Sequence, residues 1–181
     1  VSLPANTQKI SFRDGVATVN LWEYPAYRHT KSVKGTAFDA FLAYVIPNEA
    51  ERVVFLNWLA WSLKHEEQKP RWAVMLYSQK QGTGKTVLTE LVKDLFGVSN
   101  TSRINGVSQL VARFNKEVLQ HKLVIVEEIE VKKGSKEANQ VKSLITEDST
   151  TVEAKGLPSS VDSINCAFLM TTNHLPTWLE E

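Results

Sequence analysis

Three short apolar runs recur along the chain after residue 70. They cover residues 72–77, 123–126 and 166–171, and turn-forming or charged residues follow each of them. Continuous apolar runs of this length are typical of strands buried on both faces of a parallel sheet. We therefore expect three buried strands, each ending where polar residues begin.

Helical periodicity occupies the stretches between these runs. Apolar residues repeat at helical spacing across residues 85–96, 107–120 and 135–146. Gly97 stands where a glycine commonly ends a helix. Because strands alternate with helices, the pattern predicts an α/β fold with a central parallel sheet.

The first seventy residues follow a different pattern. Residues 9–12 and 16–22 alternate around a turn at 13–15, which predicts a β-hairpin. Two helices are expected next, at residues 36–46 and from Asn48 to about His65. We therefore divide the chain into a small, mainly helical N-terminal appendage (1–69) and an α/β core (70–181).

The longer of these two helices carries an aromatic-rich stripe. Asn48 is placed to cap its start, and Glu51 is placed to complete a capping box. Exposed aromatic residues can stack on nucleic-acid bases, but at helical spacing such a stripe more often belongs to the core, which is the interpretation we favour. The stripe consists of Val54, Phe55, Trp58, Leu59 and Trp61.

Composition narrows the class of protein. Hydrophobic residues make up 43% and charged residues 23% of the chain, which predicts a packed core and not a disordered segment. The formal net charge is +1, so any contact with DNA must come from a local patch or loop. The absence of an initiator methionine suggests an excised piece of a longer protein.

A few residue types indicate the compartment. The one cysteine, Cys166, excludes an intrachain disulfide and suits a reducing cytoplasm, and we expect it to be a buried core thiol. The four histidines have no metal-ligand spacing, so no zinc site is expected. We find no stretch that could span a bilayer and no signal peptide at the start. The prediction is a cytoplasmic protein with no membrane partner.

A phosphate-binding loop is predicted between the first buried strand and the helix after it. Its core is Gln81-Gly82-Thr83-Gly84-Lys85-Thr86, and a strand enters it while a helix leaves it, as such a loop requires. Its glycines would let backbone N–H groups approach phosphates, Lys85 would neutralise the β- and γ-phosphates, and Thr86 would ligate Mg²⁺. Gln79 departs from the pattern, since a glycine is usual there. The loop predicts ATP and Mg²⁺ as ligands.

Polar residues also end the other two buried strands. Glu127 would hold Mg²⁺ through water, and Glu128 would orient and deprotonate the attacking water. Asn173 follows the third strand, where its amide would position that water or touch the γ-phosphate. Taken singly, a solvated strand end and a turn-forming Asn are ordinary explanations. Together with the lysine loop, these strand-end residues predict nucleotide binding and hydrolysis.

This order of motifs resembles the superfamily 3 helicases, a viral and plasmid branch of the AAA+ ATPases. Residues 142–146 and 152–156 resemble a further signature of that family. Residues 81–85 and 172–176 resemble the helicase half of phage primase–helicase and primase–polymerase proteins. The resemblance covers roughly residues 70–176 and implies an AAA+ P-loop core.

The resemblance further implies a DNA-translocating motor in phage or plasmid replication. Family members form hexameric rings around single-stranded DNA, move 3′ to 5′ and act on forked DNA. Residues 151–155 read as one arm of a hairpin that turns at 156–158. The resemblance places Lys155 of this hairpin in the ring pore against DNA phosphates, with a solvated turn lysine as the alternative. A homo-hexamer, a primase or polymerase domain in the same parent chain, and a bacterial host cytoplasm are also implied.

Two parts of the family pattern are expected beyond residue 181. In the family, an arginine that reaches the neighbour's ATP site and one more core strand follow the Asn motif, whereas Arg103 and Arg113 lie upstream of it. We therefore expect this chain alone to bind ATP, to hydrolyse it slowly and not to form a closed hexamer. Two alternatives stay open: another AAA+ ATPase such as a loader or packaging motor, and an ATP-gated DNA-binding or assembly module without efficient hydrolysis.

Overall fold

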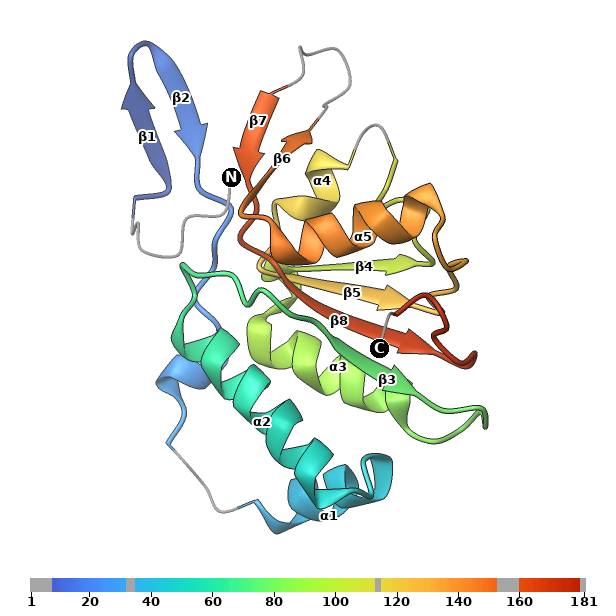
Figure 1. Cartoon of the computed structure of the whole chain (residues 1–181). Coiled ribbons are helices and arrows are strands. Elements are labelled where there is room, and N and C mark those ends of the chain that lie inside the picture. The colour runs from blue at the N-terminus through green and yellow to red at the C-terminus, as the bar shows by residue number, and fades with distance from the viewer. Residues whose placement is uncertain (1–7, 32–34, 113–114, 153–159, 180–181) are drawn as a thin grey trace.

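The computed structural model describes residues 8–31, 35–112, 115–152 and 160–179. At the centre of this described part lies a parallel sheet of four strands (Figure 1). Their order across the sheet is β3 (Val74–Tyr77), β8 (Ala167–Thr172), β5 (Leu123–Glu127) and β4 (Thr101–Asn105). The predicted α/β class with a central parallel sheet is confirmed.

Helices cover both faces of the sheet (Figure 1). One face packs against α1 (Thr36–Val45), α2 (Glu49–Lys64) and α3 (Lys85–Phe96), and the other against α4 (Lys116–Leu119) and α5 (Lys136–Thr146). Successive side chains of a strand point to opposite faces. In β8, Leu169 therefore enters the core under α3, while Phe168 and Met170 enter the core under α5. The molecule has three layers, with one hydrophobic core on each side of the sheet.

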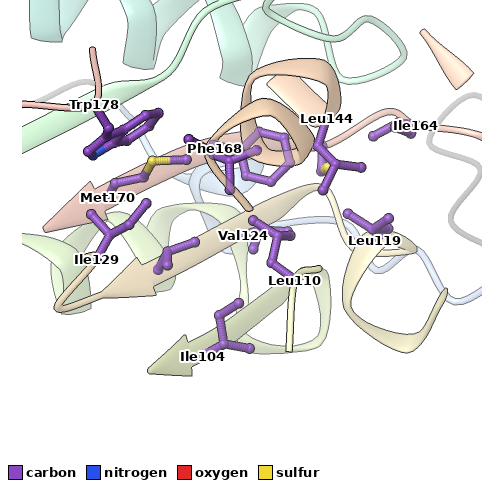
Figure 2. Close-up of a cluster of buried hydrophobic side chains, with 14 residues drawn as sticks. Ile104, Leu110, Leu119, Val124, Ile129, Leu144, Ile164, Phe168, Met170 and Trp178 are labelled. Carbon is purple, nitrogen blue, oxygen red and sulfur yellow. The ribbon is translucent and has the colours of Figure 1, made fainter. Parts of the chain in front are cut away.

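The core on the α5 side also anchors the segment after β8. Figure 2 shows Phe168 and Met170 of the sheet in one cluster with Leu144 of α5 and with Trp178. Trp178 is only 2% exposed although it lies in an irregular segment. Its burial anchors the segment that follows Asn173 to the core, and this helps to fix the position of the end of β8.

The N-terminal helices share a core with the sheet. Leu42 of α1 and Phe55 and Trp58 of α2 are buried in the same cluster as Leu76 of β3 and Leu88 of α3. The core interpretation of the aromatic stripe therefore holds for Phe55, Trp58 and Leu59, whereas Val54 is 53% exposed and Trp61 is half-buried. The division of the chain at residue 69 stays a prediction.

Local signals placed most helix ends correctly. The side chain of Asn48 accepts hydrogen bonds from the backbone N–H groups of Ala50 (2.9 Å) and Glu51 (3.4 Å), so the predicted N-cap of α2 is confirmed. Gly97 follows the last residue of α3 with a φ of +89°, the left-handed region that favours glycine. Ser135 caps α5 by accepting from the N–H of Ala138.

Two hairpins and two short 3₁₀ turns complete the described chain. The N-terminal hairpin pairs β1 (Ile10–Arg13) with β2 (Val16–Val19), as predicted. The second pairs β6 (Ser149–Val152) with β7 (Ser160–Ser163), so the arm expected at 151–155 begins slightly earlier. Lys155 and the predicted turn at 156–158 lie outside the described residues. The 3₁₀ turns are η1 (Ala26–His29) and η2 (Val98–Asn100).

Three features of the sheet region differ from the predictions. The helix expected over 107–120 is confined to α4, while residues 107–112 form turns whose apolar side chains pack on the core. The strand β4 was missed because it is an edge strand with one buried apolar side chain, Ile104, so its sequence lacks an apolar run. The third correction concerns β3, which lies at the sheet edge and is not buried on both faces: Tyr77 is 39% exposed.

Candidate functional site

A cleft of about 570 Å³ opens at the carboxyl end of the parallel strands. In open α/β sheets this is the edge at which ligands bind. The structure brings to this one cleft every residue predicted for the nucleotide site, although these residues come from three separate parts of the chain. Its lining consists of Gln81, Gly82, Thr83, Gly84, Lys85, Thr86, Val87, Asn105, Glu127, Glu128, Thr171 and Asn173.

The glycine-rich loop has a backbone that side chains would disturb. Gly82 and Gly84 have φ angles of +73° and +87°, where residues with a Cβ are strained. A Cβ on Gly84 would also lie 2.8 Å from Cγ2 of Val45 on α1. Gly84 is the N-cap of α3 and supplies no side-chain cap, so the first N–H groups of the helix stay available to an anion.

Lys85 connects the loop to the end of β8. Its Nζ donates to Oδ1 of Asn173 at 2.8 Å and to the backbone oxygen of Ser78 at 3.2 Å. Burial lowers the pKa of the Lys85 ammonium below its ordinary value. These contacts hold a cation in the middle of the cleft lining, with the predicted amide directly beside it.

Glu127 is held by an arginine that the sequence motifs did not indicate. Arg103 on β4 donates through Nη2 to Oε1 of Glu127 at 2.5 Å, and through Nη1 to Glu90 on α3. Lys93 pairs with the same Glu90. Arg103 thus fixes one of the two strand-end carboxylates and links it to α3. Its role went unrecognised because β4 itself was not predicted.

Glu128 has an unusual backbone. Its φ of +51° lies in the left-handed region, which is rare for residues other than glycine, asparagine and aspartate. The neighbouring strand maintains this conformation: the N–H of Glu128 donates to Oγ1 of Thr171 at 3.3 Å, and the N–H of Ile129 donates to the Thr171 backbone oxygen at 2.8 Å. The turn sends Ile129 into the core and leaves the Glu128 side chain exposed at the cleft. Strained residues of this kind cluster at functional sites.

Asn105 and Thr171 line the cleft but were not predicted. Asn105 ends β4 directly opposite Glu127 in the strand register. The Asn-Gly pair at 105–106 was the available signal, since such a pair marks the end of an element. Beyond β8, Oγ1 of Thr172 accepts from the N–H of His174 at 3.1 Å, which fixes the turn around Asn173.

Three further residues named in the sequence analysis remain. Lys155 and Arg113 fall outside the described residues, so the structure does not place them. Cys166 is fully buried, as expected, and burial raises the pKa of its thiol to about 12. Among the described residues we find no cluster of His, Cys, Asp and Glu that could hold a metal ion, and no helix there is both long and apolar enough to cross a bilayer.

Comparison with known proteins adds a family and two kinds of relative. A family model described as a family of unknown function, DUF5906, matches residues 76–181. A DNA primase-polymerase of Nitratiruptor phage NrS-1 is 24% identical over 175 residues, which are 93% of this chain and 24% of that protein. Two apo structures of the NrS-1 C-terminal region are similar to this chain. The first aligns with a TM-score of 0.76 at 22% identity, over 95% of this chain and 42% of its own. The second aligns with a TM-score of 0.73 at 21% identity, over 96% of this chain and 41% of its own. This likeness establishes a shared fold, and the chain spans about a quarter of the phage protein's length.

Proposed function

The chain belongs to DUF5906, a family of unknown function, and we propose that it is an ATP-hydrolysing motor domain of the superfamily 3 helicase type. It would couple ATP hydrolysis to translocation on single-stranded DNA during phage or plasmid replication in the host cytoplasm. One observation carries the proposal: a single cleft is lined by a glycine-rich loop at a helix N-terminus, a lysine, two carboxylates and an amide. The similarity to a phage DNA primase-polymerase supports a role in phage replication.

The cleft residues fit a nucleoside triphosphate. Oγ1 of Thr83 is buried and has no hydrogen-bond partner within the described chain, so a phosphate oxygen would satisfy it. The uncapped N–H groups at the start of α3 would bind phosphate in the same way. The volume of the cleft lies in the range of about 300–1,000 Å³ that small-molecule sites have. Mg²⁺ would be held by Thr86 and, through water, by Glu127, and would neutralise charge on the phosphates.

Each carboxylate and the amide would have a separate task in hydrolysis. Glu128 is exposed to the cleft and is free of the Arg103 contact, so it is suited to take a proton from the attacking water. Glu127 is oriented by Arg103 and is suited to bind the metal's water shell. Asn173 is held beside Lys85 and is suited to position the water near the γ-phosphate. Lys85 would neutralise negative charge on the phosphoryl oxygens.

For the DNA side, we propose that the β6–β7 hairpin projects into the pore of a homo-hexamer, where Lys155 contacts phosphates. A primase or polymerase domain in the same parent protein is part of this proposal, motivated by the phage relative. A loader or packaging motor would share the ATP cleft but not the hairpin's role. An ATP-gated DNA-binding module would share both but would not hydrolyse ATP efficiently.

Turnover measurements on the longer parent protein test this function, because this chain alone is expected to hydrolyse ATP slowly. ATP hydrolysis is measured with and without single-stranded DNA, and strand separation is followed on a forked duplex. A motor of the proposed type hydrolyses ATP faster when DNA is added and separates the fork. ATP binding without turnover under any DNA condition would favour the ATP-gated module, and DNA-stimulated turnover without strand separation would favour the loader or packaging motor.

A further inference from the structure

A second groove, of about 430 Å³, lies at the opposite end of the sheet from the nucleotide cleft. It is formed by the second half of α2 and by the segment that leads into β3, and it shares no lining residue with the nucleotide cleft. The side chains that matter for its chemistry are Asn57, Trp58, Trp61, Gln68, Arg71 and Trp72. Nothing in the proposed nucleotide chemistry uses them.

Three indoles line this groove. Trp72 is 44% exposed, although large aromatic side chains are usually well buried. Trp61 is half-buried, and its ring lies 4.8 Å from the His65 ring at an interplanar angle of 34°. Trp58 is 1% exposed, and its Nε1 has no hydrogen-bond partner in the part of the chain that the structure describes. The groove therefore offers the flat apolar faces of Trp72 and Trp61, with the buried Trp58 beneath them.

Polar groups around the indoles include a cation and two amides. The Arg71 side chain is 68% exposed, and its Nη2 pairs with Oδ2 of Asp148 at 2.5 Å. A guanidinium carries five N–H donors, so Arg71 can bind an anion while it keeps this contact. Asn57 and Gln68 are exposed amides that can donate and accept. This set suits a planar ligand with a polar edge and a nearby negative charge.

The segment on one side of the groove is held rigidly. Lys122 is buried and donates through Nζ to the backbone oxygen of Gln68 at 2.5 Å. Nδ2 of Asn165 donates to the backbone oxygen of Glu66 at 3.1 Å. Nζ of Lys69 donates to the backbone oxygen of Leu144 at 2.6 Å. A site that is rigid before binding loses less conformational freedom when it binds a ligand.

The same contacts place the groove at the base of the β6–β7 hairpin. Asp148, the partner of Arg71, directly precedes β6, and its backbone oxygen accepts from the N–H of Ile164, directly after β7. Nζ of Lys69 also donates a hydrogen bond to the backbone oxygen of Glu147. A strand of nucleic acid that contacts the hairpin would therefore pass close to the groove.

We propose that this groove binds an unpaired base of single-stranded nucleic acid, which stacks on Trp72 and Trp61 while its phosphate contacts Arg71. Aromatic side chains beside a cation form the usual stacking platform for single strands. A proline-rich peptide also binds aromatic grooves, but it has no anionic group for Arg71. This proposal rests on the proposed function in one respect, namely that a motor would bring single-stranded nucleic acid to the groove. Base stacking in the groove does not itself require ATP.

The test compares an oligothymidylate of about 12 nucleotides with an abasic strand of the same length, by fluorescence anisotropy at low salt and without nucleotide. We expect Trp72→Ala to weaken binding of the oligothymidylate about 5- to 150-fold, the equivalent of about 1–3 kcal/mol per stacked base. Trp72→Phe should retain most of the affinity. The abasic strand should bind Trp72→Ala and the wild type with equal affinity. Tyr44→Ala is the matched control variant, since it removes an aromatic side chain that is 68% exposed on α1. It should bind the oligothymidylate as tightly as the wild type does.

Several results would overturn the proposal. The first is equal affinity of the wild type and Trp72→Ala for the oligothymidylate. The second is a loss of affinity in Trp72→Ala that is as large for the abasic strand as for the oligothymidylate. The third is binding of an oligoproline peptide, and not of the oligothymidylate, that depends on Trp72. Quenching of intrinsic tryptophan fluorescence by the oligothymidylate, and not by the abasic strand, checks the wild type independently of any folding defect in the variant. If the chain fails to bind ATP but the Trp72 effect persists, the groove proposal stands and the proposed ATPase function fails.

Discussion

Glu128 illustrates how much of the proposed chemistry depends on one backbone angle. Its left-handed conformation separates it from Glu127, so that adjacent carboxylates have different surroundings: Glu127 is paired with Arg103, and Glu128 points to the cleft. A left-handed non-glycine residue costs of the order of 1–3 kcal/mol and persists only where the surrounding structure fixes it. Thr171 provides that restraint.

In the full-length parent protein, Glu128→Gln should preserve ATP binding and reduce turnover about 10²- to 10⁴-fold. The amide has nearly the same shape but cannot accept a proton from water, and general base catalysis typically contributes this factor. Steady-state hydrolysis and nucleotide binding are measured on the same preparations. Glu127→Gln is the matched variant, and a loss of turnover there with normal turnover in Glu128→Gln would show that the two roles are reversed.

Among the secondary-structure elements, those at the centre of the sheet were the most predictable. β5 and β8 are buried on both faces, so their sequences are continuous apolar runs, and α3 is bounded by the glycine-rich loop and by Gly97. β4 escaped prediction because an edge strand can be built from polar residues such as Arg103. The contacts made by Arg103 and Asn105 could not be foreseen for the same reason, since they depend on which strands are neighbours.

The β6–β7 hairpin gives a prediction for DNA binding. Lys155→Ala should weaken binding to single-stranded DNA of every sequence, because a lysine that contacts phosphates does not distinguish between bases. The affinity for ATP should be unchanged. The slope of log affinity against log salt should fall by about one charge. Lys133→Ala, on an exposed loop before α5, is the control. Identical salt slopes for the wild type and Lys155→Ala would exclude the phosphate contact.

Lys122 gives a prediction for the amino end of the sheet. Burial lowers the pKa of this lysine from its ordinary 10.5 to about 8, so between these pH values the unfolded chain binds the proton more tightly than the folded chain. The cost of burying the charge is fully present below pH 8 and disappears as the pH rises toward 10.5. The free energy of unfolding of the wild type, relative to Lys122→Met, should therefore increase by about 2–3 kcal/mol between pH 7 and pH 10.

Urea denaturation of both proteins at the two pH values measures this difference. Titration of the other groups cancels in the comparison, provided that Lys122→Met keeps the same fold by circular dichroism. A pH-independent difference would mean that the three oxygens around Nζ, from His65, Gln68 and Asn165, offset the cost of burial.

The molecule as a whole places two proposed sites at opposite ends of one sheet. The nucleotide cleft lies at the carboxyl ends of the strands, and the tryptophan groove lies before the amino end of β3. β5 and β8 run between the two ends through the fully buried centre. In the proposed motor, this rigid sheet would join the residues that hydrolyse ATP to the hairpin base and to the groove that would hold the single strand.

Calorimetric titration with Mg-ATP tests the nucleotide site most directly, on the wild type, Lys85→Ala and Lys80→Ala. Lys80 is an exposed neighbour that does not line the cleft, so its variant serves as the matched control. The wild type and Lys80→Ala should bind ATP with similar affinity, and Lys85→Ala should bind about 10- to 150-fold more weakly, the equivalent of about 1.5–3 kcal/mol for a hydrogen bond to a charged group. Equal affinity in all three proteins, or no binding by the wild type, would contradict the assignment of the cleft as an ATP site.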